Sequence, residues 1–247
     1  MSYCGSADAS RGAIRGLKAA LPAAVFAMGV ALASPGQATQ YFLQSDTMNT
    51  SRTAHINGPS GFHEYVYIAP IQFTAFEGVS ATGDAMSLLA FCVDIYHDIS
   101  LGTLNLKYDD SFDLTTNSKY LTTPAFTGAT ALSGGQVTQV ARLVNYGTLL
   151  FNQAPNTADK VDRLAAVQGA IWQVINPGYT VTSTSAVNNY ISAYSGANYL
   201  SNLTGYGPVS SNITFITETG KYGTRLAHQS FAFAAASAGD VATGPST

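Results

Sequence analysis

Residues with branched or aromatic side chains cluster in short runs in the first part of the chain, which is typical of β-strands. Residues 65–68 (Tyr-Val-Tyr-Ile) and 71–76 (Ile-Gln-Phe-Thr-Ala-Phe) are two such runs, and Gly78, Gly83 and Gly102 separate others. Residues 86–95 form a nearly continuous apolar run, which predicts a strand buried on both faces. Short runs at 213–216 and 230–233 predict that strands return after residue 205.

Between these two groups the apolar residues recur at helical spacing. Residues 136–151 follow a glycine pair and predict one helix. Thr157 is placed to cap a second helix, which an Asn-Pro-Gly sequence ends after residue 175, and residues 185–194 predict a third. The expected fold is mainly β with an α insertion: a β-barrel or sandwich that carries a small helical subdomain. We expect strands over about 41–130 and 205–236, a helical insertion over about 133–195, and a flexible tail at 237–247.

The first 38 residues have the pattern of a secretory signal peptide. Arg11, Arg15 and Lys18 precede an apolar run over residues 19–33, and small residues surround a cleavage site after Ala38. An apolar run of about 15 residues is short for a bilayer span, which favours a signal peptide over a membrane anchor. We expect no membrane span in the mature chain. The expected domain is thus residues 39–236, in a secreted, extracellular or cell-surface protein.

Composition narrows the class of protein further. Only 10% of the 247 residues are charged, whereas 46% are hydrophobic, which argues against intrinsic disorder. Few and scattered basic residues, with an overall net charge of −3, argue against a nucleic-acid partner. A neutral surface rich in hydroxyl and amide groups suits an extracellular β-rich protein.

The mature chain has a single cysteine, because Cys4 lies within the expected signal peptide and only Cys92 remains. One cysteine cannot form an internal disulfide. An unpaired cysteine in an oxidising compartment indicates an intermolecular bond, a reactive thiol or another fate.

Gln168 is the second unusual residue. It lies within the apolar stripe of the second predicted helix, four residues after Leu164 and four before Trp172, so it should face the core. A buried carboxamide needs hydrogen-bond partners or costs a few kcal/mol, about 1–3 by mutational measurement. A nearby backbone group that satisfies it is the plainer interpretation.

The sequences around these two residues resemble the two signatures of bacterial thioester domains, which are found in surface adhesins. Residues 91–94 (Phe-Cys-Val-Asp) match an aromatic-Cys-aliphatic strand, and residues 167–172 (Val-Gln-Gly-Ala-Ile-Trp) match an aliphatic-Gln-x-x-aliphatic-aromatic helix. The resemblance implies an internal thioester between the Cys92 sulfur and the side-chain carbonyl carbon of Gln168. It also implies supporting roles for Phe91, Asp94 and Trp172 around the crosslink.

The same stretch is similar to exported Gram-negative proteins with a PEP-CTERM sorting tail. No hydrophobic span or arginine cluster of such a tail follows Gly244, so the sequence predicts no mode of anchoring. Gln168 follows Cys92 by 76 positions (168 minus 92), a short interval beside many adhesin examples.

A thioester stores a reactive acyl group, and the resemblance therefore implies adhesion by covalent attachment. An amine, such as a lysine on a surface or matrix partner, or a hydroxyl group would displace the thiol in a single use. We expect no enzymatic turnover, no cofactor and no metal. The environment would be a cell surface, an extracellular matrix or a biofilm.

Three other interpretations stay open. A cysteine hydrolase needs a histidine near Cys92, and His97 would lie on the opposite face of an extended strand. The acidic residues at 109–113, or Asp94 with Asp98, lack the spacing of an EF-hand calcium loop. The main rival is a non-covalent structural or polysaccharide-associated matrix protein in which Cys92 is a free buried thiol.

Overall fold

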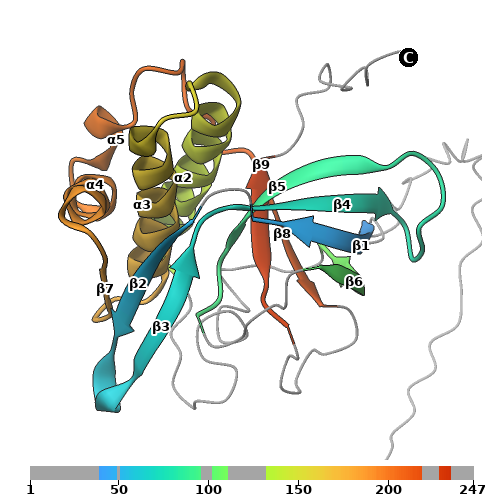
Figure 1. Cartoon of the computed structure of the whole chain (residues 1–247), viewed down its shortest axis with the longest axis horizontal. Helices are drawn as coiled ribbons and strands as arrows, with labels where there is room; N and C mark the ends of the chain where they lie inside the picture. Colours follow the sequence, from blue (N-terminus) through green and yellow to red (C-terminus); the bar gives the residue numbers. More distant parts are fainter. Residues whose placement is uncertain (1–38, 49–50, 96–101, 111–131, 219–227, 235–247) are drawn as a thin grey trace, which may run out of the picture. The chain divides into compact units, whose positions relative to one another are not determined.

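Six strands form a closed antiparallel barrel (Figure 1). The computed structural model describes residues 39–48, 51–95, 102–110, 132–218 and 228–234, and the structural statements below concern these residues. In barrel order the strands are β1 (Gln40–Thr47), β4 (Ile71–Glu77), β5 (Met86–Cys92), β9 (Phe231–Ala234), β8 (Ile213–Glu218) and β6 (Thr103–Asp109). The predicted fold class is confirmed, with a barrel in place of a sandwich.

A second, three-stranded sheet has the order β3-β2-β7. It consists of β2 (Arg52–Asn57), β3 (His63–Ile68) and β7 (Thr180–Thr182), and a short 3-10 turn η1 (Pro59–Gly61) joins the first two. The chain leaves this sheet for the barrel between Ile68 and Ile71. The sequence did not predict β7, because three residues are too few to show a strand pattern.

The helical part contains α2 (Gly134–Gln153), α3 (Ala158–Ile175), α4 (Ser185–Ser195) and the short α5 (Tyr199–Asn202). The three longer helices confirm the predicted ones to within two residues at each end. Thr157 caps α3 as predicted, since its side chain accepts a hydrogen bond from Lys160 N. Ser133 and Gln136 form a capping box at the start of α2, which the sequence analysis did not identify.

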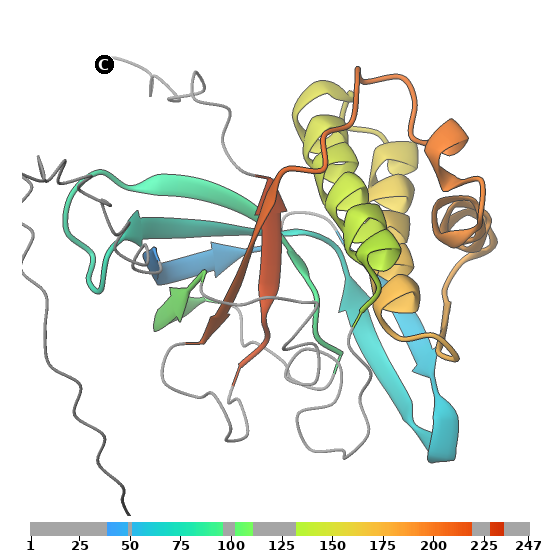
Figure 2. The same cartoon turned by 180° about the vertical axis from the view of Figure 1, so that it is seen from behind.

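The α3 helix is buried more completely than a single apolar stripe predicts. Every residue from Leu164 to Ile175 is buried except Gln173, and Val161, which belongs to the predicted stripe, is only half-buried. The cause is that α3 packs against α2, α4 and the β3-β2-β7 sheet at once, an arrangement visible from behind in Figure 2. At Gly169 a Cβ atom would lie 2.7 Å from Ile191 Cδ1, so any other residue there would force the Ile191 side chain of α4 to shift.

The prediction of a strand over 86–95 is wrong in two respects. The strand ends at Cys92, and its first half is not buried on both faces, since Ser87 is exposed. Only Ala90, Phe91 and Cys92 are buried, because α2 and α3 cover just this end of β5. No helix within the described ranges is both long and apolar enough to cross a membrane. Residues 1–38 and 237–247, with their predicted signal peptide and tail, lie outside the described residues.

Candidate functional site

Cys92 is the last residue of β5, and its backbone polar groups point away from β9. Val93 N donates to Ser230 O at 3.0 Å, so the adjacent residue Cys92 directs its own N–H and C=O toward the opposite side, where β4 lies. The first residue of β4, Ile71, pairs with Ala90 and follows a proline. The ladder between β4 and β5 therefore stops two residues before Cys92.

The side chain of Gln168 takes the position that a strand residue would have occupied. Its Oε1 accepts a hydrogen bond from Cys92 N at 2.9 Å, and its Nε2 donates to Cys92 O at 2.8 Å. The orientation of the carboxamide follows from this pairing, since a backbone N–H can only donate and a carbonyl can only accept. Gln168 is 1% exposed. The helix and the barrel are thus joined through one residue from each of the two motifs.

A second glutamine, Gln229, contacts the sulfur itself. Cys92 Sγ donates to Gln229 Oε1 at 3.2 Å, and Gln229 Nε2 donates to the backbone oxygen of Asp94 at 3.1 Å. The hydroxyl of the fully buried Tyr108 donates to Gln229 O at 2.8 Å and fixes this segment. The sequence analysis missed both residues, because Gln229 precedes a four-residue strand and no local pattern distinguishes it.

The environment of the thiol disfavours its ionised form. Burial raises the pKa of Cys92, and the negative charges of Asp94 and Asp46 raise it further. Asp94, a predicted supporting residue, is buried and acts on the thiol in this direction. A cysteine hydrolase needs the opposite, a thiolate stabilised by a nearby positive charge.

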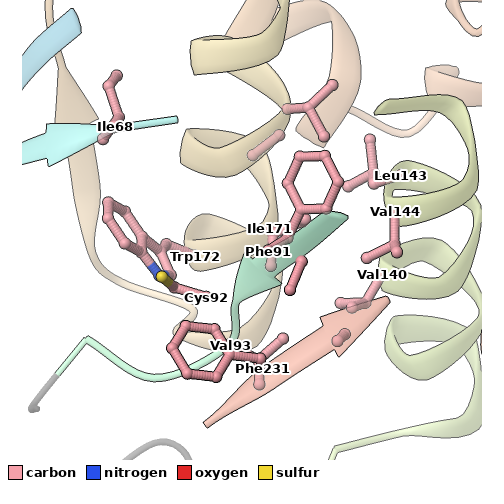
Figure 3. Packing of buried hydrophobic residues seen from close by; sticks show 14 of the residues in the cluster. Ile68, Phe91, Cys92, Val93, Val140, Leu143, Val144, Ile171, Trp172 and Phe231 are labelled. Carbon is pink, nitrogen blue, oxygen red and sulfur yellow. The ribbon is translucent and has the colours of Figure 1, made fainter. Parts of the chain in front are cut away.

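Phe91 and Trp172, the other two predicted supporting residues, are both buried at the site. Figure 3 shows the Phe91 ring directed toward α2, and the Trp172 indole and Cys92 sulfur turned away from it. The Phe91 ring lies so close to Gly147 that a Cβ there would be 2.3 Å from Phe91 Cζ. Trp172 Nε1 is buried without a hydrogen-bond partner. Both side chains belong to the same buried core as Cys92, and their supporting roles stay a prediction.

The residues of the alternative sites lie elsewhere. Among the described residues no histidine is hydrogen-bonded to the Cys92 sulfur: His55 stacks on His63, and His228 pairs with Glu218 at 3.2 Å. His97, Asp98 and residues 111–113 lie outside the described residues. No group of three metal-ligating side chains is found in the described part of the chain.

A cavity of about 730 Å³ lies at the turn between α2 and α3 and includes neither Cys92 nor Gln168. The charged residue of its lining is Lys160, whose Nζ donates to Phe151 O at 2.6 Å, Ala154 O at 3.0 Å and Asn156 Oδ1 at 3.0 Å. An ammonium group has three protons to donate. Lys160 therefore has none left for a ligand, and we assign it a structural role.

Comparisons of the chain with models of protein families, with curated protein sequences and with solved structures each found no match. The two sequence motifs and the geometry of this site are therefore the observations that bear on function.

Proposed function

We propose that the protein is an exported surface or matrix protein that attaches covalently to an amine-bearing partner through an internal thioester between Cys92 and Gln168. One observation carries the proposal. The Gln168 carboxamide, remote in sequence and buried, is hydrogen-bonded to both backbone groups of Cys92. A core glutamine could be satisfied in many places, and this one is satisfied at the only cysteine of the mature chain.

Formation of the thioester requires the Cys92 sulfur to attack Cδ of Gln168. The Sγ–Cδ bond forms, the Cδ–Nε2 bond breaks, and the nitrogen leaves as ammonia with the thiol proton. Negative charge develops on Oε1 in the tetrahedral intermediate, and Oε1 faces the N–H of Cys92. Since the pKa of the thiol is raised, the reaction depends on rigid placement, which contributes several kcal/mol, about 7 or more in good intramolecular cases.

In attachment Cδ of Gln168 is attacked again, and Cys92 changes from nucleophile to leaving group. A lysine amine of the partner attacks Cδ, an amide bond forms, the Cδ–Sγ bond breaks, and a proton passes from the amine to the sulfur. A hydroxyl group would give an ester in the same way. Cys92 is the leaving group and is not regenerated as a thioester, so each molecule reacts once. A covalent bond suits adhesion because it does not dissociate under flow.

The alternative function has an observation in its favour as well. Two hydrogen bonds of ordinary length give both the oxygen and the nitrogen of the Gln168 amide a partner. An amide with such partners is also a stable part of a protein core. In that case the protein is a non-covalent matrix component and Cys92 is a buried thiol.

The intact mass of the purified protein separates the two functions. A thioester lowers the mass by one ammonia relative to the sequence, and methylamine then raises it by one methylamine. Cys92→Ala and Gln168→Ala should each abolish both changes, whereas Gln173→Ala, on the same helix, should retain them. A full mass, with Cys92 alkylated only after denaturation, would overturn the covalent proposal.

A further inference from the structure

The β3-β2-β7 sheet has one buried face and one exposed face. Ala54, Ile56 and Val181 on the buried face pack toward α3. The opposite face carries His55, His63, Tyr65 and Tyr67, with Thr180 and Thr182 beside them, and we call these six residues the aromatic face. A sheet held from behind by a helix presents such a face in a fixed geometry, which lowers the cost of binding.

The exposure of the two tyrosines is unusual for this protein. Tyr65 is 62% and Tyr67 is 67% exposed. Among the described residues the other exposed large hydrophobic side chains are Val79 and Leu200, each at 50%. Tyr65 contacts the His55 ring at 4.8 Å between centroids, and His55 stacks on His63 at 5.3 Å. Contiguous exposed rings bordered by polar groups are typical of an interaction surface.

The aromatic face carries no charged side chain of the Lys, Arg, Asp or Glu type. Arg52 and Glu64 alternate to the other side of their strands, and Arg52 there binds Asp162 of α3 at 2.6 Å. A nucleic acid or an anionic lipid surface needs cations, which this face lacks. A protein partner commonly needs about 800 Å² on each side with an apolar centre, and the face is instead a narrow strip of rings and hydroxyl groups.

We propose that the aromatic face binds a neutral polysaccharide. The C–H face of a pyranose ring is apolar and packs on an aromatic ring, while its hydroxyl groups bond to neutral polar side chains at the edge. Tyr65 and Tyr67 are two residues apart on one strand, about 6.6 Å, a separation of the same order as the repeat of a sugar chain. The Thr180 and Thr182 hydroxyls, two strands away across the sheet, lie at the border of the strip.

This surface is separate from the Cys92–Gln168 contact and binds without the thioester. It would hold the protein on a matrix chain while covalent attachment proceeds elsewhere. The two proposals can therefore fail independently, and Cys92→Ala should leave polysaccharide binding unchanged.

Affinity electrophoresis in native gels tests the proposal. The gels contain a neutral β-glucan, dextran, galactomannan or, as the charged comparison, alginate. We expect retardation of the wild-type protein in at least one neutral gel and a loss of about tenfold in apparent affinity for the Tyr65→Ala/Tyr67→Ala double variant. Tyr65→Phe/Tyr67→Phe keeps the rings and should retain binding, as should Val79→Ala/Leu200→Ala, the matched control for lost exposed apolar surface.

Circular dichroism and thermal unfolding verify that each variant is folded as the wild type is. The proposal would be overturned if no neutral gel retarded the wild-type protein, or if only the alginate gel did. It would also be overturned if the alanine double variant were retarded as strongly as the wild type. A dimer that dissociates in the alanine variant without any polysaccharide effect would overturn it too, and would assign the face to contact between copies of this chain.

Discussion

Two buried polar side chains on the same helix, Lys160 and Gln168, reach their partners in different ways. The three acceptors of Lys160 lie four, six and nine residues away in the sequence, at the end of α2 and in the turn that leads to α3. Both partners of Gln168 belong to a residue 76 positions away in the barrel. The lysine therefore stabilises a local turn, whereas the glutamine joins two parts of the fold.

This difference between local and long-range partners helps to distinguish a buried polar side chain with a structural role from one in a candidate functional site. Lys160 donates to Phe151 O and Ala154 O, two backbone oxygen atoms at the end of α2, and to the side-chain oxygen of Asn156, which is a sufficient structural reason for its burial. Gln168 instead occupies a gap at the end of a sheet ladder, next to a thiol. A side chain whose partners depend on the whole fold is a stronger candidate for chemistry than one satisfied by its neighbours.

The largest expected effect is that of Gln168→Leu. The variant leaves Cys92 N–H and C=O buried without partners, and we expect the free energy of unfolding to fall by about 3 kcal/mol. Gln173→Leu, whose side chain accepts one hydrogen bond from Ser195, should cost less than about 1 kcal/mol. Urea unfolding measures the free energy of unfolding of both variants. Equal losses would show that the contact between Gln168 and Cys92 stabilises the fold no more than the contact of Gln173 with Ser195.

Gly147→Ala tests the packing that holds β5 against α2. The new methyl group would collide with the Phe91 ring, and we expect a loss of about 2 kcal/mol in stability together with displacement of the residue next to Cys92. Gly135→Ala, in the exposed first turn of α2, should be neutral or slightly stabilising. Thermal unfolding compares the two variants, and a neutral Gly147→Ala would contradict the packing described here.

Lys160→Met tests how much the local hydrogen bonds of Lys160 stabilise the turn between α2 and α3. The apolar stem remains but the three carbonyl groups lose their donor, so we expect a loss of about 1.5 kcal/mol. Lys107→Met, at an exposed position of β6, is the matched control and should change stability by less than about 0.5 kcal/mol. The thioester mass signature should be intact in both, and its loss in Lys160→Met would refute a purely structural role.

Gln229→Ala should have the smallest effect on stability, below about 1 kcal/mol, because the residue is only partly buried. It removes the group hydrogen-bonded to the Cys92 sulfur, so we expect faster reaction with methylamine. If the thiol is free, faster alkylation under native conditions is expected instead. Gln139→Ala, which alters a contact with α4, provides the control, and an unchanged rate in Gln229→Ala would show that this side chain does not cover the sulfur.

Local patterns in the sequence were enough to predict the three long helices, the cap at Thr157 and the barrel strands near residues 71–76 and 213–216. Each of these depends on spacing or capping within a few residues. The strand end at Cys92 and the complete burial of α3 could not be predicted this way. Both depend on which elements pack over them, and β7 is too short to leave any pattern of its own.

The sequence by itself identified Cys92 and the core-facing Gln168 as the unusual residues, because composition and helical periodicity are properties of the chain alone. Only the tertiary structure decided that the two meet, that the Cys92 sulfur is hydrogen-bonded to Gln229, and that α3 packs on one face of the β3-β2-β7 sheet and leaves the face of Tyr65 and Tyr67 exposed. Each of these results requires segments far apart in the sequence to come together. Such contacts arise from the closure of the barrel and the packing of α3, for which no short stretch of sequence contains the information.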